Sequence, residues 1–230
     1  MKDLILLHGA IGSSVQLEKL ADSLKDNFRI TLLNFSGHGG KGIPKDPFSI
    51  KLFAEDILYL LDKGKFEKPD VFGYSMGGYV AIYIARYFPD KLNRIFTLAA
   101  KFDWNPESSS KESKMLNPEK LMEKLPDFAK ELSDRHMPAD WKIVLQKTAE
   151  MMINLGNGNS LSKEDLSKIK NVVRISVGDR DKMVSIEESM EAYRCLDNGS
   201  FLVMPDTPHP IEKVSVERLS GEISEFFSDL

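Results

Sequence analysis

A serine at position 75, flanked by glycines, constrains the fold more than any other feature of the chain. The G-x-S-x-G pattern of residues 73–77 follows a short strand-like run, residues 69–72, and precedes residues 79–85, whose apolar side chains recur at helical spacing. Glycines two residues before and two after the serine permit a sharp turn in which a side chain would collide with the neighbouring chain. The pattern predicts that Ser75 lies at the tip of an elbow between a strand and a helix.

The rest of the chain alternates between apolar runs and amphipathic segments. Apolar runs without polar alternation are typical of parallel strands that helices cover on both faces. Residues 4–7 form such a run, and further strand-like segments, including the one before Ser75, occupy residues 29–33, 69–72, 94–100, 172–177 and 201–204. Helical spacing follows in residues 15–26, 49–63, 165–169, 186–196 and 212–227. This alternation predicts an α/β fold with a doubly wound, mostly parallel sheet of about six strands.

The alternation stops after the fourth predicted strand. Residues 108–111 read as a polar loop, whereas residues 116–132 and 141–155 have helical spacing, and no convincing strand occurs between them. We therefore expect a helical insertion within one α/β core. The predicted division is a core of residues 1–100 and 160–230 and an insertion of residues 101–159.

Composition argues against several classes of protein. The 230 residues include 31 Lys and Arg against 35 Asp and Glu, a net charge of −4, and no basic block that would favour nucleic acid. The single cysteine, Cys195, excludes an internal disulfide. The apolar run at residues 4–7 is too short for a signal peptide or a membrane span. We expect a cytoplasmic protein, a monomer or homodimer, that neither inserts into membranes nor binds nucleic acid.

The loop of residues 37–42 has the spacing of a dinucleotide-binding fingerprint, G-x-G-x-x-G, and follows a predicted strand. That fingerprint functions by opening a helix whose N-terminus faces the pyrophosphate, and Pro44 and Pro47 oppose a helix here. The chain also lacks an H-E-x-x-H pattern and paired cysteines. We predict no cofactor and no metal.

Ser75 needs a base, because a serine hydroxyl is a poor nucleophile until a neighbouring group takes its proton. Two loops follow the last two predicted strands, residues 178–181 and 205–210, and the carboxyl ends of parallel strands meet at one edge of the sheet. The second loop supplies His209 as the base. For the acid, Asp179, Asp181 and Asp206 all remain open on position alone.

Four motifs in this order resemble the α/β-hydrolase family over nearly the whole chain outside the insertion. They are His8-Gly9-x-x-Gly12 after the first strand, Gly73-Tyr74-Ser75-Met76-Gly77-Gly78, Gly178-x-x-Asp181 and His209. The chain lacks the two strands that most members carry before the His-Gly loop. The resemblance therefore implies a sheet order of 2-1-3-4-5-6. His209 departs from the pattern in following Pro208 where members often have glycine, which restricts the approach of this loop.

The resemblance also implies a role for each site residue. Ser75 would be the nucleophile, His209 the general base and later the general acid, and Asp181 the group that fixes the imidazole tautomer. The backbone amides of Ala10 and Met76 would form the oxyanion hole.

The insertion resembles the helical lid of that family. We expect an apolar substrate pocket under it, because methionine adapts to irregular shapes and the insertion is rich in methionine. The predicted substrate-binding residues are Ile11, Phe102, Trp104 and Trp141. Met115, Met122, Met137, Met151 and Met152 are further candidates.

These features predict a serine hydrolase that cleaves a small, moderately apolar carboxylic ester or thioester through an acyl-enzyme. Two alternatives stay open. One is a carbon-carbon bond hydrolase or lyase of the same fold, similar to the lyase of the menaquinone pathway. The other is a receptor-like module that binds a ligand and retains the three residues without turnover.

Overall fold

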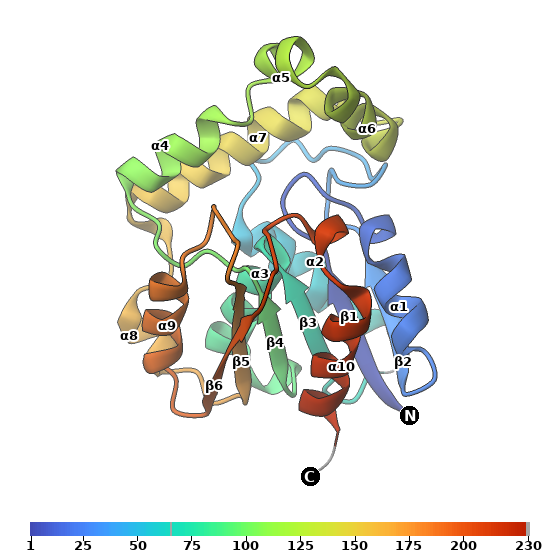
Figure 1. Ribbon diagram of the computed structural model, residues 1–230, viewed down its shortest axis with the longest axis vertical. Coiled ribbons are helices and arrows are strands. Elements are labelled where there is room, and N and C mark those ends of the chain that lie inside the picture. Colours follow the sequence, from blue (N-terminus) through green and yellow to red (C-terminus); the bar gives the residue numbers. More distant parts are fainter. Residues whose placement is uncertain (65, 229–230) are drawn as a thin grey trace.

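The computed structural model describes residues 1–64 and 66–228, and its centre is a parallel sheet of six strands (Figure 1). The strand order is β2-β1-β3-β4-β5-β6, and every neighbouring pair is parallel. The strands are β1 (Lys2–Leu7), β2 (Phe28–Leu33), β3 (Asp70–Tyr74), β4 (Ile95–Leu98), β5 (Val173–Gly178) and β6 (Gly199–Met204). The predicted fold class and sheet order are confirmed.

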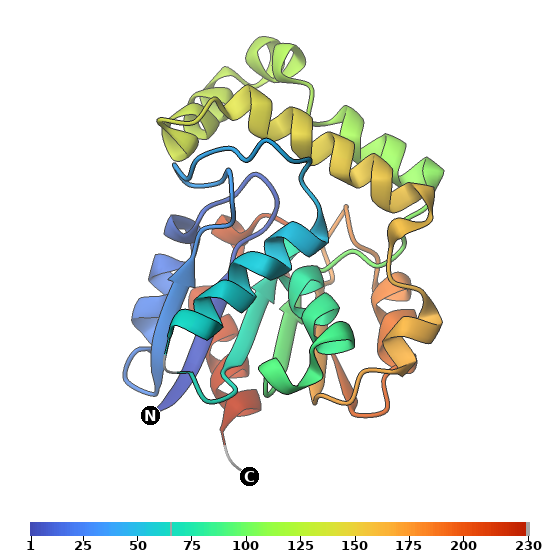
Figure 2. The ribbon, with the colours of Figure 1, turned by 180° about the vertical axis from the view of Figure 1, so that it is seen from behind.

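Helices cover both faces of this sheet (Figures 1 and 2). On one face lie α1 (Glu18–Leu24), which continues a 3₁₀ turn at Ser14–Leu17, and α10 (Val216–Phe227), preceded by another at Ile211–Lys213. On the other lie α2 (Ile50–Lys63), α3 (Met76–Tyr87), α8 (Lys163–Ser167) and α9 (Ile186–Arg194). A short turn, Pro89–Lys91, follows α3. In the described part of the chain, no helix has both the length and the apolar character needed to cross a membrane.

Strand β1 shows why its sequence has no polar alternation. Leu4 and Leu6 pack with the apolar side chains of α1 and α10, while Ile5 and Leu7 point the other way and pack with α2 and α3. All four side chains are fully buried. A strand covered on both faces has no solvent side, so each position favours an apolar residue.

Between β4 and β5 the chain forms four helices that lie above the carboxyl ends of the strands (Figure 1). They are α4 (Pro106–Lys114), α5 (Pro118–Lys124), α6 (Pro126–His136) and α7 (Trp141–Asn154), and a π-helical turn, Leu155–Asn159, ends the last of them. We call this segment, residues 101–159, the helical insertion. It has a small apolar core of its own, formed by Leu121, Ala129, Leu132, Trp141 and Leu145.

Two predictions for the insertion are wrong. Residues 108–111, predicted as a loop, belong to α4, because the Asn105 side chain caps this helix by accepting from the amides of Glu107 and Ser108. Residues 116–132, predicted as one helix, form parts of two. Pro126 has no amide hydrogen and disfavours helical geometry at Leu125, so α5 ends at Lys124 and α6 begins at Pro126.

Candidate active site

Ser75 lies on a tight elbow between β3 and α3. Its backbone has φ 49° and ψ −117°, a conformation that costs a non-glycine residue about 1–3 kcal/mol. Close packing keeps the turn in place. A Cβ on Gly73 would lie 2.5 Å from the Gly78 backbone, and one on Gly77 would lie 2.6 Å from the Leu7 carbonyl. The glycines let the start of α3 approach both β1 and its own strand, which raises Ser75 above the edge of the sheet.

His209 joins Ser75 to Asp181. The Asp181 Oδ2 atom lies 2.7 Å from His209 Nδ1, and His209 Nε2 lies 3.4 Å from Ser75 Oγ. The other Asp181 oxygen accepts from the amides of Met183 and Val184, each at 2.8 Å. A carboxylate held in this way keeps the imidazole proton on Nδ1, so Nε2 is free to accept the Ser75 proton. The bond to Ser75 is long, as is common before substrate binds.

The structure separates the competing acids. Asp179 accepts from the Thr207 amide at 3.1 Å, and the backbone amides of Asp206 and Thr207 lower the pKa of its carboxyl. Asp206 is exposed and lies 3.8 Å from Arg180. Of the three candidates, Asp181 is the one that contacts His209. The backbone carbonyl of His209 accepts from the Tyr74 hydroxyl at 2.8 Å, so the strand before Ser75 also holds the loop of Pro208.

Two backbone amides lie beside Ser75. Met76 is the first residue of α3, so its amide has no acceptor within the helix. Ala10 follows Gly9, where a Cβ would lie 3.2 Å from the Ser75 Cβ, and both Ala10 and Met76 line the same cavity as Ser75. Neither amide donates to another group in residues 1–64 and 66–228. Such a pair of free donors can bind a negatively charged oxygen.

The next residue of that loop, Ile11, has φ 53°, which is unusual for a β-branched side chain. Its carbonyl accepts two hydrogen bonds from α6, from Arg135 Nη1 at 3.2 Å and from His136 Nε2 at 3.0 Å. The helical insertion therefore holds the loop that carries Ala10.

The remaining histidines are buried and neutral. His8 Nε2 accepts from the Phe35 amide at 3.2 Å, and Nδ1 donates to the Gly9 carbonyl at 2.7 Å. Burial lowers the pKa of His8 and that of His136 to about 4, and it lowers the pKa of His38 well below its usual value. No group of three His, Cys, Asp or Glu side chains among the described residues forms a metal-binding arrangement.

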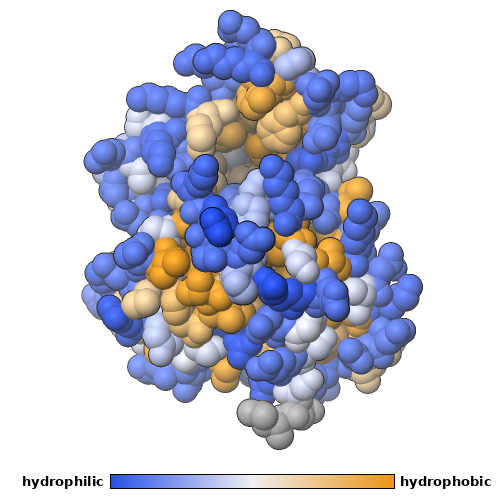
Figure 3. All heavy atoms as spheres, viewed as in Figure 1, coloured by the Kyte–Doolittle hydropathy of each residue, from blue (hydrophilic) through white to orange (hydrophobic). Residues whose placement is uncertain are grey.

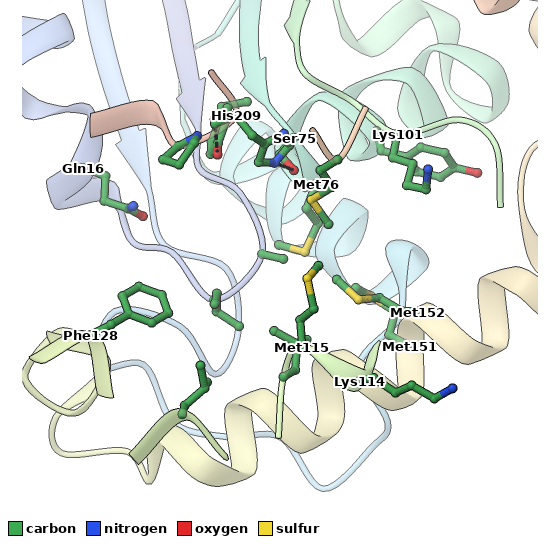
Figure 4. Close-up of a pocket in the computed structure, with 18 of the residues that line it drawn as sticks. Gln16, Ser75, Met76, Lys101, Lys114, Met115, Phe128, Met151, Met152 and His209 are labelled. Carbon is green, nitrogen blue, oxygen red and sulfur yellow. Dashed lines mark hydrogen bonds between the residues drawn. The ribbon is translucent and has the colours of Figure 1, made fainter. Parts of the chain in front are cut away.

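A cavity of about 720 Å³ lies between parts of the helical insertion and the core and reaches Ser75 and His209 (Figure 4). Apolar side chains visible in the hollow between these two parts of the molecule are bordered by polar ones (Figure 3). The apolar lining of the cavity includes Met115, Leu116, Leu121, Phe128, Met151, Met152, Leu155 and Met183. The volume and the lining suit a small, mainly apolar molecule.

Comparison with known proteins agrees with this fold. A family model described as alpha/beta hydrolase fold matches residues 3–136, more than half of the chain. The chain belongs to the alpha/beta hydrolase fold family. This family assignment is consistent with the fold of two solved structures. An enol-lactonase from Burkholderia xenovorans has a TM-score of 0.79 at 17% identity, covering 99% of this chain and 92% of that one. A putative lipase from Acinetobacter baumannii has a TM-score of 0.83 at 17% identity, covering 98% and 83%.

Curated relatives of this alpha/beta hydrolase fold chain match only in part. A pimeloyl-[acyl-carrier protein] methyl ester esterase from Neisseria meningitidis is 29% identical over 102 residues, which are 44% of this chain and 38% of that protein. A 3-oxoadipate enol-lactonase from Acinetobacter baylyi is 23% identical over 92 residues, 40% of this chain and 34% of that protein. The chain thus matches little more than a third of the length of these relatives. Both names describe hydrolases.

The predicted substrate-binding residues divide into two pairs. Ile11 and Trp104 line the cavity, as do Met115, Met151 and Met152. Phe102 and Trp141 lie outside the lining, so the prediction that they bind substrate is wrong. The Phe102 ring packs against Tyr79 with centroids 5.8 Å apart, and Trp141 is buried in the core of the insertion. Met122 and Met137 are exposed on the surface of the insertion and do not line the cavity.

Sequence reasoning missed several residues that line the cavity, notably Lys101, Phe128 and Arg135. Phe128 lies on α6 with apolar neighbours and was a detectable candidate. Lys101 had no signal, because its partner Glu188 lies 87 residues away in the chain.

Proposed function

We propose that this chain is a serine hydrolase that cleaves a moderately apolar carboxylic ester or thioester through an acyl-enzyme on Ser75. One observation supports it most. The hydrogen-bonded series Ser75, His209 and Asp181 opens into an apolar cavity beside two unpaired amides. A nucleophile, its base, a group that orients the base and donors for an oxyanion are together what acyl transfer requires.

In the proposed reaction the Ser75 oxygen attacks the substrate carbonyl while His209 Nε2 takes the hydroxyl proton. Asp181 stabilises the resulting imidazolium, and the amides of Ala10 and Met76 bind the oxyanion of the tetrahedral intermediate. His209 then protonates the leaving group. Water, activated by the same imidazole, hydrolyses the acyl-enzyme. Loss of one oxyanion donor costs about 3–4 kcal/mol of transition-state stabilisation in comparable sites.

The helical insertion acts as a lid in this proposal. Its apolar side chains cover the cavity from above, so it would exclude water and bind the acyl or alcohol group. The hydrogen bonds from Arg135 and His136 to the Ile11 carbonyl also connect the insertion to the loop that carries the Ala10 amide.

Turnover of p-nitrophenyl esters with short and medium acyl chains tests the proposal. Ser75→Ala should abolish it, while Ser110→Ala, on the insertion and outside the cavity lining, should retain it. Equal rates in the wild type and Ser75→Ala would exclude Ser75 as the nucleophile. Consumption of dicarbonyl substrates without any ester turnover would favour carbon-carbon cleavage.

A further inference from the structure

Lys101 is a buried cation in the cavity that holds Ser75. The Ser75 amide donates to the Leu98 carbonyl at 2.8 Å, and Lys101 follows Leu98 by three residues, so the two residues leave neighbouring strands at the same edge. Lys101 lines the cavity, yet only 8% of its surface is exposed. In the view of Figure 4 it lies on the opposite side of Ser75 from His209.

The ammonium of Lys101 is only partly satisfied. Its Nζ donates to Glu188 Oε2 at 3.2 Å, and the Trp104 ring lies 5.9 Å from it. An ammonium has three donors, and in the described part of the chain Glu188 is the one hydrogen-bond acceptor that reaches it. Donors that remain free on a buried cation favour a further acceptor.

Backbone amides hold the Glu188 carboxylate in place, so it cannot readily move to accept further hydrogen bonds from Lys101. Its Oε1 accepts from the amides of Phe102 at 3.1 Å and Asp103 at 3.3 Å, and its Oε2 accepts from the Ser185 amide at 3.3 Å. The Trp104 indole also donates to the Lys101 carbonyl at 3.0 Å. Both partners of the ion pair are therefore fixed, and the ammonium has a defined place in the wall of the cavity.

The charges of the cavity lining favour an anion. Lys101, Lys114, Lys120, Lys124 and Arg135 line it against a single carboxylate, Glu212, although the chain as a whole carries −4. No carboxylate within ion-pair distance of Lys114, Lys120 or Lys124 occurs in residues 1–64 and 66–228. A concave surface with one sign of charge and apolar walls concentrates ligands of the opposite sign.

Glu112, on α4, is a further buried carboxyl whose charge interacts with Lys101. Burial raises the pKa of Glu112, whereas the positive charge of Lys101 acts to lower it. One of its oxygens, Oε2, has no hydrogen-bond partner among the described residues. Among the described residues, Glu188 is the carboxylate within ion-pair distance of Lys101, at 3.2 Å, and it also accepts from three amides.

We propose that Lys101 binds a carboxylate on the acyl part of the substrate, so that the enzyme prefers half-esters of dicarboxylic acids to neutral esters. This inference rests on the proposed function and specifies its substrate class. The three lysines of α4 and α5 would attract the anion to the cavity, and Lys101 would hold it while Ser75 attacks the ester carbonyl. Lys101 is then a specificity residue, outside the proton transfers.

The test compares kcat/KM for monomethyl esters of dicarboxylic acids with kcat/KM for methyl esters of monocarboxylic acids of equal chain length. A charge-assisted hydrogen bond should give the wild type about a 10- to 100-fold preference for the half-ester at the best length. Lys101→Met should remove this preference, mainly through KM, and Lys101→Arg should retain part of it. Lys130→Met, on α6 and outside the cavity lining, should leave it unchanged.

Lys101→Met leaves Glu188 buried without its partner, so the double variant Lys101→Met, Glu188→Gln provides a neutral replacement for the pair. It should also lose the preference. Ester turnover with no preference in the wild type, or a preference that persists in both variants, would overturn the inference and leave the proposed function intact. A preference for thioesters with a phosphate in the leaving group, retained without Lys101, would also overturn it.

Binding gives a second readout that needs no turnover. Calorimetry should detect the half-ester bound to Ser75→Ala and a loss of at least tenfold in affinity when Lys101→Met is added. If the wild type hydrolyses no ester yet this difference appears, the proposed function fails and carboxylate recognition by Lys101 stands. Equal affinity of the two variants would contradict the inference.

Discussion

His136 on α6 donates a hydrogen bond from Nε2 to the carbonyl of Ile11, 3.0 Å away. The same ring accepts from the Gly39 amide through Nδ1 at 3.2 Å. One buried side chain of the helical insertion therefore connects two loops of the core, the one that precedes α2 and the one that carries Ala10. The insertion is structurally coupled to the proposed oxyanion site as well as covering it.

Replacement of His136 by leucine should destabilise the fold and slow the reaction. Both ring hydrogen bonds are lost and the Gly39 amide is left unpaired, which should lower the free energy of unfolding by about 2–3 kcal/mol. Ile11 keeps only Arg135, so kcat should fall about tenfold with a smaller change in KM. Urea unfolding and ester kinetics measure the two effects. Lys130→Leu on the same helix should change stability by less than about 0.5 kcal/mol, and equal effects of the two variants would refute the coupling.

Acid should destabilise the protein through its buried histidines. His8 and His136 have a pKa of about 4 in the folded state, and burial also lowers the pKa of His38. In the unfolded chain these histidines bind a proton near pH 6.5, whereas in the folded protein they remain neutral to a lower pH. The stability that they contribute is therefore fully present above pH 6.5 and decreases as the pH falls toward 4. Each histidine contributes a slope of about 1.4 kcal/mol per pH unit within that window.

The urea midpoint measured from pH 7.5 downward follows this loss. His136→Leu should reduce the dependence of the free energy of unfolding on pH by about 1.4 kcal/mol per pH unit, because one titrating group has been removed. A midpoint that stays constant between pH 7 and pH 5 would show that these histidines are already charged in the folded protein.

The two aspartates after β5 should differ sharply. Asp181→Asn removes the carboxylate that faces His209 Nδ1, and kcat should fall by about 10³- to 10⁴-fold with little loss of stability. Asp179→Asn affects a carboxylate bound to the Thr207 amide, and kcat should change by only a few fold. Steady-state ester kinetics compare the variants directly. If Asp179→Asn inactivates the enzyme and Asp181→Asn does not, the acid is Asp179 and the assignment to Asp181 is wrong.

Ser75 should reduce stability in the wild type. At φ 49° a glycine is unstrained, whereas serine and alanine are strained. The free energy of unfolding of Ser75→Gly should therefore be about 1 kcal/mol higher than that of Ser75→Ala, although both variants lack the hydroxyl. Chemical denaturation of the two variants decides this, and equal stabilities would mean that the elbow relaxes when the hydroxyl is removed.

The sheet was predictable from the sequence for a physical reason. Strands buried on both faces are continuous apolar runs, and short-range glycine patterns mark the elbow of Ser75, so both signals are local. The position of His209 was also predictable, because parallel strands bring the loops at their ends to one edge. The insertion was harder. Its helix α4 depends on the cap at Asn105 and is otherwise polar, so apolar spacing gave no signal there.

The lining of the cavity was the least predictable part. Phe102 and Trp141 have the size and apolar character of substrate-binding residues, yet each packs against apolar partners in the folded chain. Lys101 looks like a solvated lysine in the sequence, yet it is buried and pairs with Glu188 of α9. Such long-range pairs leave no local pattern.

Labelling by a fluorophosphonate, followed by peptide mass spectrometry, tests the central claim most directly. The wild type should gain one covalent adduct, located on the peptide that contains Ser75, because His209 activates that hydroxyl. Ser75→Ala should gain none, and Asp181→Asn should react much more slowly. An adduct of equal yield in Ser75→Ala, or one located on another residue of the wild type, would contradict the account.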